Sequence, residues 1–178
     1  MNIIRTKIDD CIIIEPEVFE DDRGFFLETF NDFKYKKIIG INKNFVQDNH
    51  SRSTKHVLRG LHFQKKKPQG KLVRVTRGSV FDVAVDLRKN SLFFGKYVSV
   101  ILSEENKKQF WIPSGFAHGF LALSDNVDFE YKCTDYYDPT DEGCIRWNDP
   151  SINIQWPINN PILSKKDAGA KNLCDLSI

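Results

Sequence analysis

The chain has 178 residues, of which 40% are hydrophobic and 28% are charged, and its formal net charge is +2. This length predicts one compact domain over residues 1–178, and the composition is that of a globular protein rather than a disordered one. The small net charge and scattered Lys and Arg argue against a nucleic-acid partner. Because no stretch resembles a signal peptide or membrane span, we expect a cytoplasmic protein with no membrane partner.

The cysteines support the same cellular setting. Their spacing contains no close pair, which excludes a zinc knot and a redox Cys-x-x-Cys motif, so we expect reduced thiols. The four positions are Cys11, Cys133, Cys144 and Cys174. The densest charge run, Lys65-Lys66-Lys67, is followed by Pro68-Gln69-Gly70 and indicates an exposed loop.

Short β-like runs separated by turn residues follow one another along the chain. They predict strands at 11–14, 24–30, 45–49, 57–63, 71–76, 79–87, 96–102, 109–112, 119–123 and 128–133. A short helix is expected from Asn31 to Ile39, stopped by Gly40, and another is expected to begin at Ser164.

The run 79–87 has the clearest pattern. Phe81, Val83 and Val85 alternate with polar or small residues, which predicts a half-buried strand, and Arg77-Gly78 before it predicts a tight hairpin. About ten short strands without long helices between them indicate an antiparallel sandwich or jelly roll. They exclude a doubly wound α/β fold.

Histidine is the side chain best suited to proton transfer near neutral pH. His50 and His56 flank a polar, turn-like stretch (49–55) and are weak candidates. His62 lies at the end of a β-like run, and His118 directly precedes an apolar strand, so both are stronger candidates.

The spacing Pro-x-Gly-x-x-His at His118 matches the second metal motif of many cupins. A metal cupin has His-x-His in its first motif, whereas this chain has His62-Phe63-Gln64, and Gln is a poor ligand for a transition metal. We therefore predict no metal. A metal-dependent cupin oxygenase stays open as a minor alternative.

Chemistry without a metal needs a base, an opposing acid and a group that stabilises negative charge. His62 is the natural base, Tyr131 can serve as a weak acid, and Lys71 and Arg59 can stabilise an oxyanion. The plainer alternatives are that Tyr131 is a core residue and that Lys71 caps a loop. Strict alternation places Arg59 and His62 on opposite faces of a strand, so we predict a bulge at Gly60 that brings both to one side.

The motifs together resemble the dTDP-4-dehydrorhamnose 3,5-epimerase family, in the right order from about residue 9 to about residue 168. The strings that carry the resemblance are Asp22-Arg23-Gly24 with Glu28, Gln47-Asp48-Asn49-His50-Ser51-Arg52-Ser53, Leu58-Arg59-Gly60-Leu61-His62-Phe63-Gln64, Gly70-Lys71-Leu72-Val73-Arg74-Val75, Phe81-Asp82-Val83-Ala84-Val85-Asp86, Trp111-Ile112-Pro113-Ser114-Gly115-Phe116-Ala117-His118-Gly119-Phe120, Tyr131-Lys132 with Asp135-Tyr136-Tyr137, Arg146-Trp147-Asn148-Asp149-Pro150 and Leu163-Ser164-Lys165-Lys166-Asp167. The resemblance implies an all-β, cupin-like jelly-roll β-barrel with a few short peripheral helices.

The resemblance also assigns roles to individual residues. It implies that His62 is the general base, that Asp167 orients it, that Tyr131 is the acid on the other face of the sugar, and that Lys71 lies near the C4 oxygen. The positions that it implies for binding nucleotide, diphosphate or sugar are Arg23, Glu28, Gln47, Arg59, Lys71, His118, Tyr137, Glu142 and Lys166. By spacing alone, Ser164-x-x-Asp167 indicates a helix capping box, and the resemblance reverses that preference.

The implied reaction inverts C3 and C5 of a dTDP-4-keto-6-deoxyhexose, with no cofactor. The family is dimeric with exchanged strands, so we expect a homodimer in which Arg23 and Glu28 serve the other copy's site. The alternatives are an epimerase that inverts C3 alone or C5 alone of a related nucleotide sugar, the metal-dependent oxygenase, and a sugar-binding cupin without catalytic activity.

Overall fold

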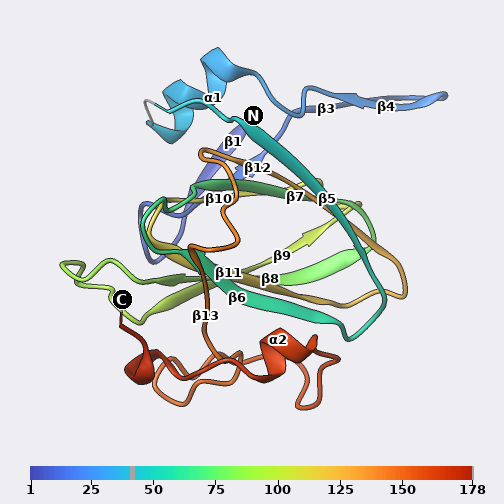
Figure 1. Ribbon diagram of the computed structural model, residues 1–178. Helices are drawn as coiled ribbons and strands as arrows, with labels where there is room; N and C mark the ends of the chain where they lie inside the picture. Colours follow the sequence, from blue (N-terminus) through green and yellow to red (C-terminus); the bar gives the residue numbers. More distant parts are fainter. Residues whose placement is uncertain (41–42, 178) are drawn as a thin grey trace.

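Two antiparallel β-sheets face each other and form the body of the protein (Figure 1). The computed structural model describes residues 1–40 and 43–177. The six-stranded sheet has the order β1-β2-β10-β7-β12-β5, and the five-stranded sheet has the order β13-β6-β11-β8-β9. Every ladder between these strands is antiparallel. The predicted all-β class is confirmed.

The six-stranded sheet consists of β1 (Asn2–Arg5), β2 (Ile12–Glu15), β10 (Gln109–Ile112), β7 (Lys71–Arg77), β12 (Val127–Cys133) and β5 (Gln47–Ser53). The five-stranded sheet consists of β13 (Glu142–Cys144), β6 (Leu58–Gln64), β11 (Phe116–Ala122), β8 (Ser79–Asp86) and β9 (Tyr97–Ser103). A separate hairpin of β3 (Val18–Asp21) and β4 (Gly24–Leu27) projects from the body (Figure 1).

The main hydrophobic core lies between the two sheets. Period-two alternation sends one set of side chains from each strand into this layer, including Val73 and Phe129 from one sheet and Phe120 from the other. The rings of Phe120 and Phe129 stack with centroids 4.2 Å apart, so the two sheets are joined by aromatic contact as well as by aliphatic packing.

Strand β8 differs from its prediction. It is buried on both faces rather than one, because Phe81, Val83 and Val85 pack under the C-terminal segment while the other face points to the interior. That inner face carries Asp82 and Asp86, both with 0% exposure. The sequence pattern cannot reveal that this second face is buried, because an Asp that alternates with apolar residues is typical of a solvent-facing position.

Strand β5 is longer than predicted. It runs from Gln47 to Ser53, so most of the stretch 49–55 that we expected to be a turn is paired with β12, with His50 opposite Glu130. A polar sequence tolerates this position because β5 is an edge strand with one face turned outward. Strands β1, β3 and β13 were not predicted.

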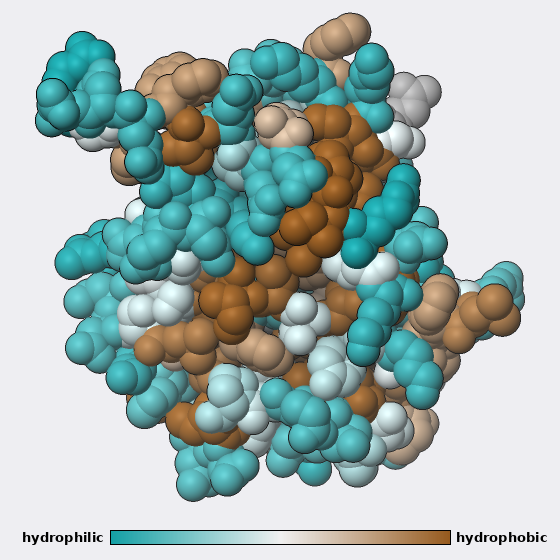
Figure 2. Space-filling model, turned by 180° about the vertical axis from the view of Figure 1, so that it is seen from behind, coloured by the Kyte–Doolittle hydropathy of each residue, from teal (hydrophilic) through white to brown (hydrophobic). Residues whose placement is uncertain are grey.

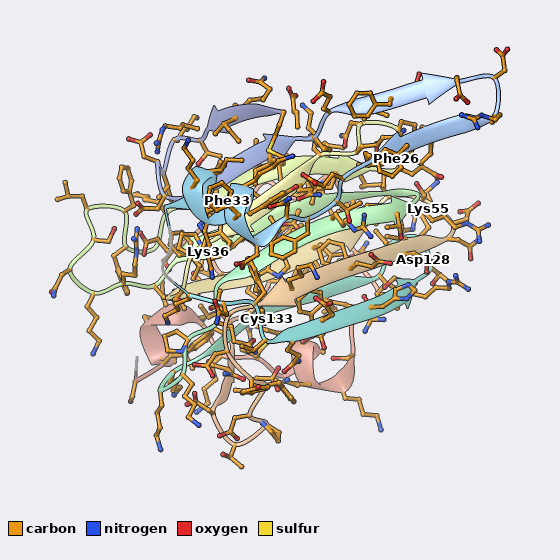
Figure 3. The ribbon with its side chains drawn as sticks, turned by 90° about the horizontal axis from the view of Figure 1, so that it is seen from above. Phe26, Phe33, Lys36, Lys55, Asp128 and Cys133 are labelled. Carbon is orange, nitrogen blue, oxygen red and sulfur yellow. The ribbon has the colours of Figure 1, made fainter. Side chains whose placement is uncertain are left out.

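Short helices cover the outer surfaces of the two sheets. Helix α1 (Asp32–Ile39) begins and ends as predicted: Asn31 accepts a hydrogen bond from the Lys34 amide, and Gly40 has φ +71°. It lies over the six-stranded sheet, and Figure 3 labels Phe33 and Lys36 on it. The buried Tyr35 hydroxyl of this helix donates to Gln109 Oε1 of β10 at 3.0 Å. Helix α2 (Lys165–Ala168) follows Ser164, and the 3-10 helix η1 (Leu173–Asp175) lies near the end of the chain.

Within the described residues, neither length nor apolar character allows any helix to cross a bilayer. Apolar side chains nevertheless reach the surface. Seen from behind, they lie beside the projecting hairpin and across the middle of the molecule (Figure 2). On the hairpin itself, Phe25 is 59% and Phe26 is 69% exposed.

Candidate active site

A cavity of about 450 Å³ opens between the sheets and helix α2. Its walls come from strands of both sheets and from the segment that leads into α2. The residues that line it are Ser51, Val57, Leu58, Arg59, His62, Lys71, His118, Gly119, Phe120, Phe129, Tyr131, Ile162, Leu163, Ser164, Lys166 and Asp167. Seven of the predicted site residues are among them: Arg59, His62, Lys71, His118, Tyr131, Lys166 and Asp167.

His62 and Asp167 form a hydrogen-bonded pair in this cavity. His62 Nε2 lies 2.6 Å from Asp167 Oδ1, and the Asp167 side chain is only 4% exposed. Burial alone raises the pKa of Asp167, but the hydrogen bond and charge of His62 outweigh burial and hold this pKa below its usual value. The carboxylate therefore stays ionised and fixes the imidazole proton on Nε2, which leaves Nδ1 as the nitrogen that can accept a proton.

The predicted bulge at Gly60 brings Arg59 and His62 to the same cavity. His118 pairs with His62 and Phe120 pairs with Arg59, so two residues of β6 stand opposite the single residue Gly119 of β11. Gly60 has φ +119°, and a Cβ there would lie 2.6 Å from the Gly119 Cα. Glycine is required by both the backbone angle and the close approach of β11.

Lys71 and Tyr131 lie on the opposite wall, in the six-stranded sheet. Lys71 pairs with Cys133, two residues from Tyr131, so the two side chains are diagonal neighbours, with Lys71 Nζ 6.0 Å from the Tyr131 ring centre. Burial raises the pKa of Tyr131 to about 12, so the phenol keeps its proton at neutral pH. Burial lowers the pKa of Lys71, opposed by nearby acidic groups that include Asp82.

His118 is held by a second carboxylate. Its Nε2 lies 3.0 Å from Asp82 Oδ2, both side chains are buried, and its ring stacks on Phe129. Burial lowers the pKa of His118 despite the opposing effect of Asp82, which favours a neutral imidazole. The buried Asp82 fixes the orientation of His118 in the cavity wall.

Three further predicted residues, Tyr137, Glu142 and Gln47, are linked to the cavity through Lys166. The Lys166 ammonium forms an ion pair with Glu142, which also accepts a hydrogen bond from the Tyr137 hydroxyl at 2.8 Å. The Tyr137 amide in turn donates to Gln47 Oε1 at 2.8 Å. This chain of contacts joins polar groups from β5, β13 and the segment before β13 to the cavity-lining Lys166.

Arg23 and Glu28 are not brought to this cavity. Arg23 lies at the tip of the β3–β4 hairpin, where its side chain is 90% exposed and pairs with Asp21. Glu28 follows β4 and pairs with Lys34 of α1 at 2.8 Å. Figure 3 shows the hairpin, with Phe26, extending away from the body of the sheet.

Sequence reasoning missed several residues that the fold brings into or beside the site. Ser51 and Phe129 line the cavity, Asp82 supports His118, and Cys144 Sγ lies 3.7 Å from Asp167 Oδ1. Asp82 carried no local signal, because its alternation with Phe81 and Val83 is typical of a solvent-facing position. Cys144 carried no signal, because its position beside Asp167 depends on the pairing of β13 with β6.

Comparison with known proteins gives a consistent result. A family model described as dTDP-4-dehydrorhamnose 3,5-epimerase matches residues 5–175. The dTDP-4-dehydrorhamnose 3,5-epimerase of Escherichia coli K12 is 60% identical over 169 residues, covering 94% of this chain and 91% of that protein.

Two solved structures are similar as well. The dTDP-6-deoxy-D-glucose-3,5-epimerase of Legionella pneumophila, in complex with dTDP-4-keto-L-rhamnose, has a TM-score of 0.95 and 57% identity, covering 97% of this chain and 93% of that one. A 3'-monoepimerase from Streptomyces bikiniensis, in complex with dTDP-quinovose, has a TM-score of 0.89 and 30% identity, covering 96% and 87%. The cupin jelly-roll prediction is confirmed, and the chain belongs to the dTDP-4-dehydrorhamnose 3,5-epimerase family.

Proposed function

We propose that this protein inverts C3 and C5 of dTDP-4-dehydro-6-deoxy-D-glucose, giving dTDP-4-dehydro-L-rhamnose for dTDP-L-rhamnose biosynthesis. One observation carries the proposal: the base and the acid stand on opposite walls of one cavity. His62 belongs to β6 of the five-stranded sheet, and Tyr131 belongs to β12 of the six-stranded sheet. Inverting a carbon requires removal of a proton from one face and return of a proton to the other.

The substrate makes the reaction possible without a cofactor. Its C4 carbonyl acidifies the C–H bonds at C3 and C5, so each centre is inverted through an enolate. His62, held by Asp167, removes the proton through Nδ1, and Asp167 stabilises the imidazolium that forms. General base catalysis of this kind contributes about 10²–10⁴-fold to the rate.

Lys71 stabilises the enolate oxygen. It lines the cavity, and a donor that meets developing negative charge in a site shielded from water contributes roughly 2.7–4 kcal/mol. Tyr131 is protonated at neutral pH and donates the C5 proton from the far wall. The low-dielectric surroundings that raise the pKa of Tyr131 also strengthen the attraction between the lysine and the enolate.

The polar side chains in and beside the cavity are suited to binding different parts of the substrate. Arg59, with its planar guanidinium, suits a phosphate oxygen pair, and neutral His118 suits a sugar hydroxyl. Gln47, Tyr137 and Glu142, which are joined by contacts to the cavity-lining Lys166, are assigned to the nucleotide part of the substrate together with that lysine.

We also propose that residues 1–178 act as one domain and form a homodimer, in which each hairpin reaches the other copy. Arg23 and Glu28 then complete the partner's site rather than their own. The support is that the hairpin projects from its own body and exposes Phe25 and Phe26 (Figures 1 and 3). An apolar projection of this kind is stabilised when a second surface covers it.

The test is proton NMR of dTDP-4-keto-6-deoxyglucose with chelator-treated enzyme in D2O. Deuterium entering both C3 and C5, with the L-rhamno product formed, supports the double epimerase. Exchange at one carbon alone reassigns the protein to the single-centre epimerases, to which the 30%-identical monoepimerase structure belongs. Activity that requires a restored metal favours the oxygenase-type alternative, and no exchange at either carbon overturns the proposal.

A further inference from the structure

We propose that His62, Cys144 and Asp167 form an inhibitory site for a thiophilic divalent cation, with Zn²⁺ as the ligand best suited to it. The three side chains offer one nitrogen, one sulfur and one oxygen, and these ligand atoms all lie within 4.8 Å of one another. The inhibitory part of the inference rests on the proposed function, because it assigns the proton transfer to His62.

The geometry of the three atoms is close to that of a zinc site. Ligands at 2.0–2.3 Å from a tetrahedral ion lie roughly 3.3–3.6 Å apart. Cys144 Sγ is already 3.7 Å from Asp167 Oδ1, and the 2.6 Å contact between His62 Nε2 and Asp167 Oδ1 has to open by less than about 1 Å. The third pair, His62 and Cys144, lies within 4.8 Å and has to close by at most about 1.2 Å, so side-chain rotations suffice.

The surroundings leave room for a fourth ligand. The His62 side chain is 30% exposed and lines the cavity, so water can complete the coordination. Asp167 is buried and Cys144 is half-buried, and the Ser164 hydroxyl accepts from the Asp167 amide, which holds the start of α2 in place. The site is thus anchored on β6, β13 and α2 and is open toward the substrate.

Binding of the cation would remove the base. A metal on Nε2 takes the place of the proton that Asp167 now accepts, and the neutral imidazole must then carry its proton on Nδ1. Nδ1 is the nitrogen assigned to the substrate proton, so the loaded enzyme has no lone pair for it. The thiol proton of Cys144 is released to solvent when the thiolate binds the ion.

Thiolate ligation also predicts which ions inhibit. A Cys–His–Asp set suits Zn²⁺ and Co²⁺, whereas Mg²⁺ prefers an octahedral oxygen environment. Cys174 offers a matched control within the same chain. Its Sγ lies 3.7 Å from Asp175 Oδ1, the same distance as Cys144 from Asp167, but no histidine joins this pair among the described residues.

The experiment has a spectroscopic arm and an activity arm. Co²⁺ is added to metal-free enzyme without substrate, and the thiolate-to-cobalt charge-transfer band is recorded for wild type, Cys144→Ser and Cys174→Ser. We expect the band in wild type and Cys174→Ser, its displacement by Zn²⁺, and its absence in Cys144→Ser. Epimerisation is then titrated with Zn²⁺ and with Mg²⁺, each variant being compared with its own metal-free rate.

The expected result is inhibition by Zn²⁺ that EDTA reverses, with the half-inhibiting concentration raised at least about tenfold by Cys144→Ser and unchanged by Cys174→Ser. Equal Zn²⁺ sensitivity of both variants, or a cobalt band that survives in Cys144→Ser, overturns the proposal. Cys144→Ala serves in the same two arms if the serine variant does not fold. Failure of the proposed function is separate: it shows as absent epimerisation in the metal-free enzyme while the cobalt band persists.

Discussion

The imidazole of His62 on β6 lies 2.6 Å from the carboxylate of Asp167 on α2, although 105 residues separate them in the chain. The fold closes this distance by returning the C-terminal segment beneath the five-stranded sheet, where the Leu58 amide donates to the Ile162 carbonyl at 3.0 Å. The short helix that follows presents Asp167 to the cavity. A four-residue helix thereby positions the partner of the proposed base.

Asp167→Asn is expected to lower kcat by about 10²–10⁴-fold. An amide that donates to Nε2 places the imidazole proton on Nδ1, and it removes the charge that stabilises the imidazolium. Steady-state rates measure the loss, with Asp175→Asn as a control from the same segment. A variant that keeps most of the wild-type rate with an intact fold contradicts the positioning role of Asp167.

Tyr131→Phe is expected to affect the reaction at C5 but not proton exchange at C3. The ring remains to pack beside Phe129 while the proton donor is lost, so deuterium exchange at C3 should continue and formation of the C5-inverted product should fall by at least about 10²-fold. NMR of the product mixture distinguishes the two carbons. Unchanged C5 inversion would show that another group supplies this proton.

Gly60→Ala is expected to destabilise the fold by several kcal/mol, because it combines a φ of +119° with a Cβ that would lie 2.6 Å from the Gly119 Cα. Gly24→Ala is the matched control, since Gly24 has φ +130° and nothing within 4 Å of the added carbon. Urea unfolding compares the two. If both variants lose the same stability, the close approach of β11 is not what requires glycine at position 60.

The local parts of the site could be predicted from the sequence. His62, Lys71 and Tyr131 stand in strands whose pattern was visible, and the Gly60 bulge followed from the spacing of Arg59 and His62. The role of Asp167 beside His62 could be predicted only from the family resemblance, because spacing alone favoured a helix cap. The structure keeps half of that cap: Ser164 Oγ accepts from the Asp167 amide, but the carboxylate bonds His62.

The rest depended on tertiary structure that no local pattern encodes. Asp82 has the alternation of a solvent-facing residue, yet it is buried because its face of β8 points into the interior between the sheets, while the C-terminal segment covers the opposite face. The length of β5 is set by its pairing with β12 rather than by propensity. Cys144 lies close to Asp167 because two separate segments, β13 and α2, both pack beside His62 of β6.

Mixing inactive variants tests the exchange of hairpins. In a heterodimer of His62→Ala and Arg23→Ala chains, one site receives both defects and the other is intact if Arg23 acts in the other copy. Random pairing makes half the dimers mixed, so activity should recover to about a quarter of wild type. No recovery, after native mass spectrometry has shown that the dimers mix, contradicts action of Arg23 across the dimer.

If His62 removes the substrate proton, deuterium incorporation has to depend on its imidazole, which His62→Ala deletes. Wild type and variant are incubated with dTDP-4-keto-6-deoxyglucose in D2O, and exchange at C3 and C5 is followed by proton NMR alongside a circular dichroism spectrum. We expect the variant to retain its fold and to lose exchange at both carbons by at least about 10²-fold. Exchange at the wild-type rate in a folded His62→Ala protein would contradict this role of His62.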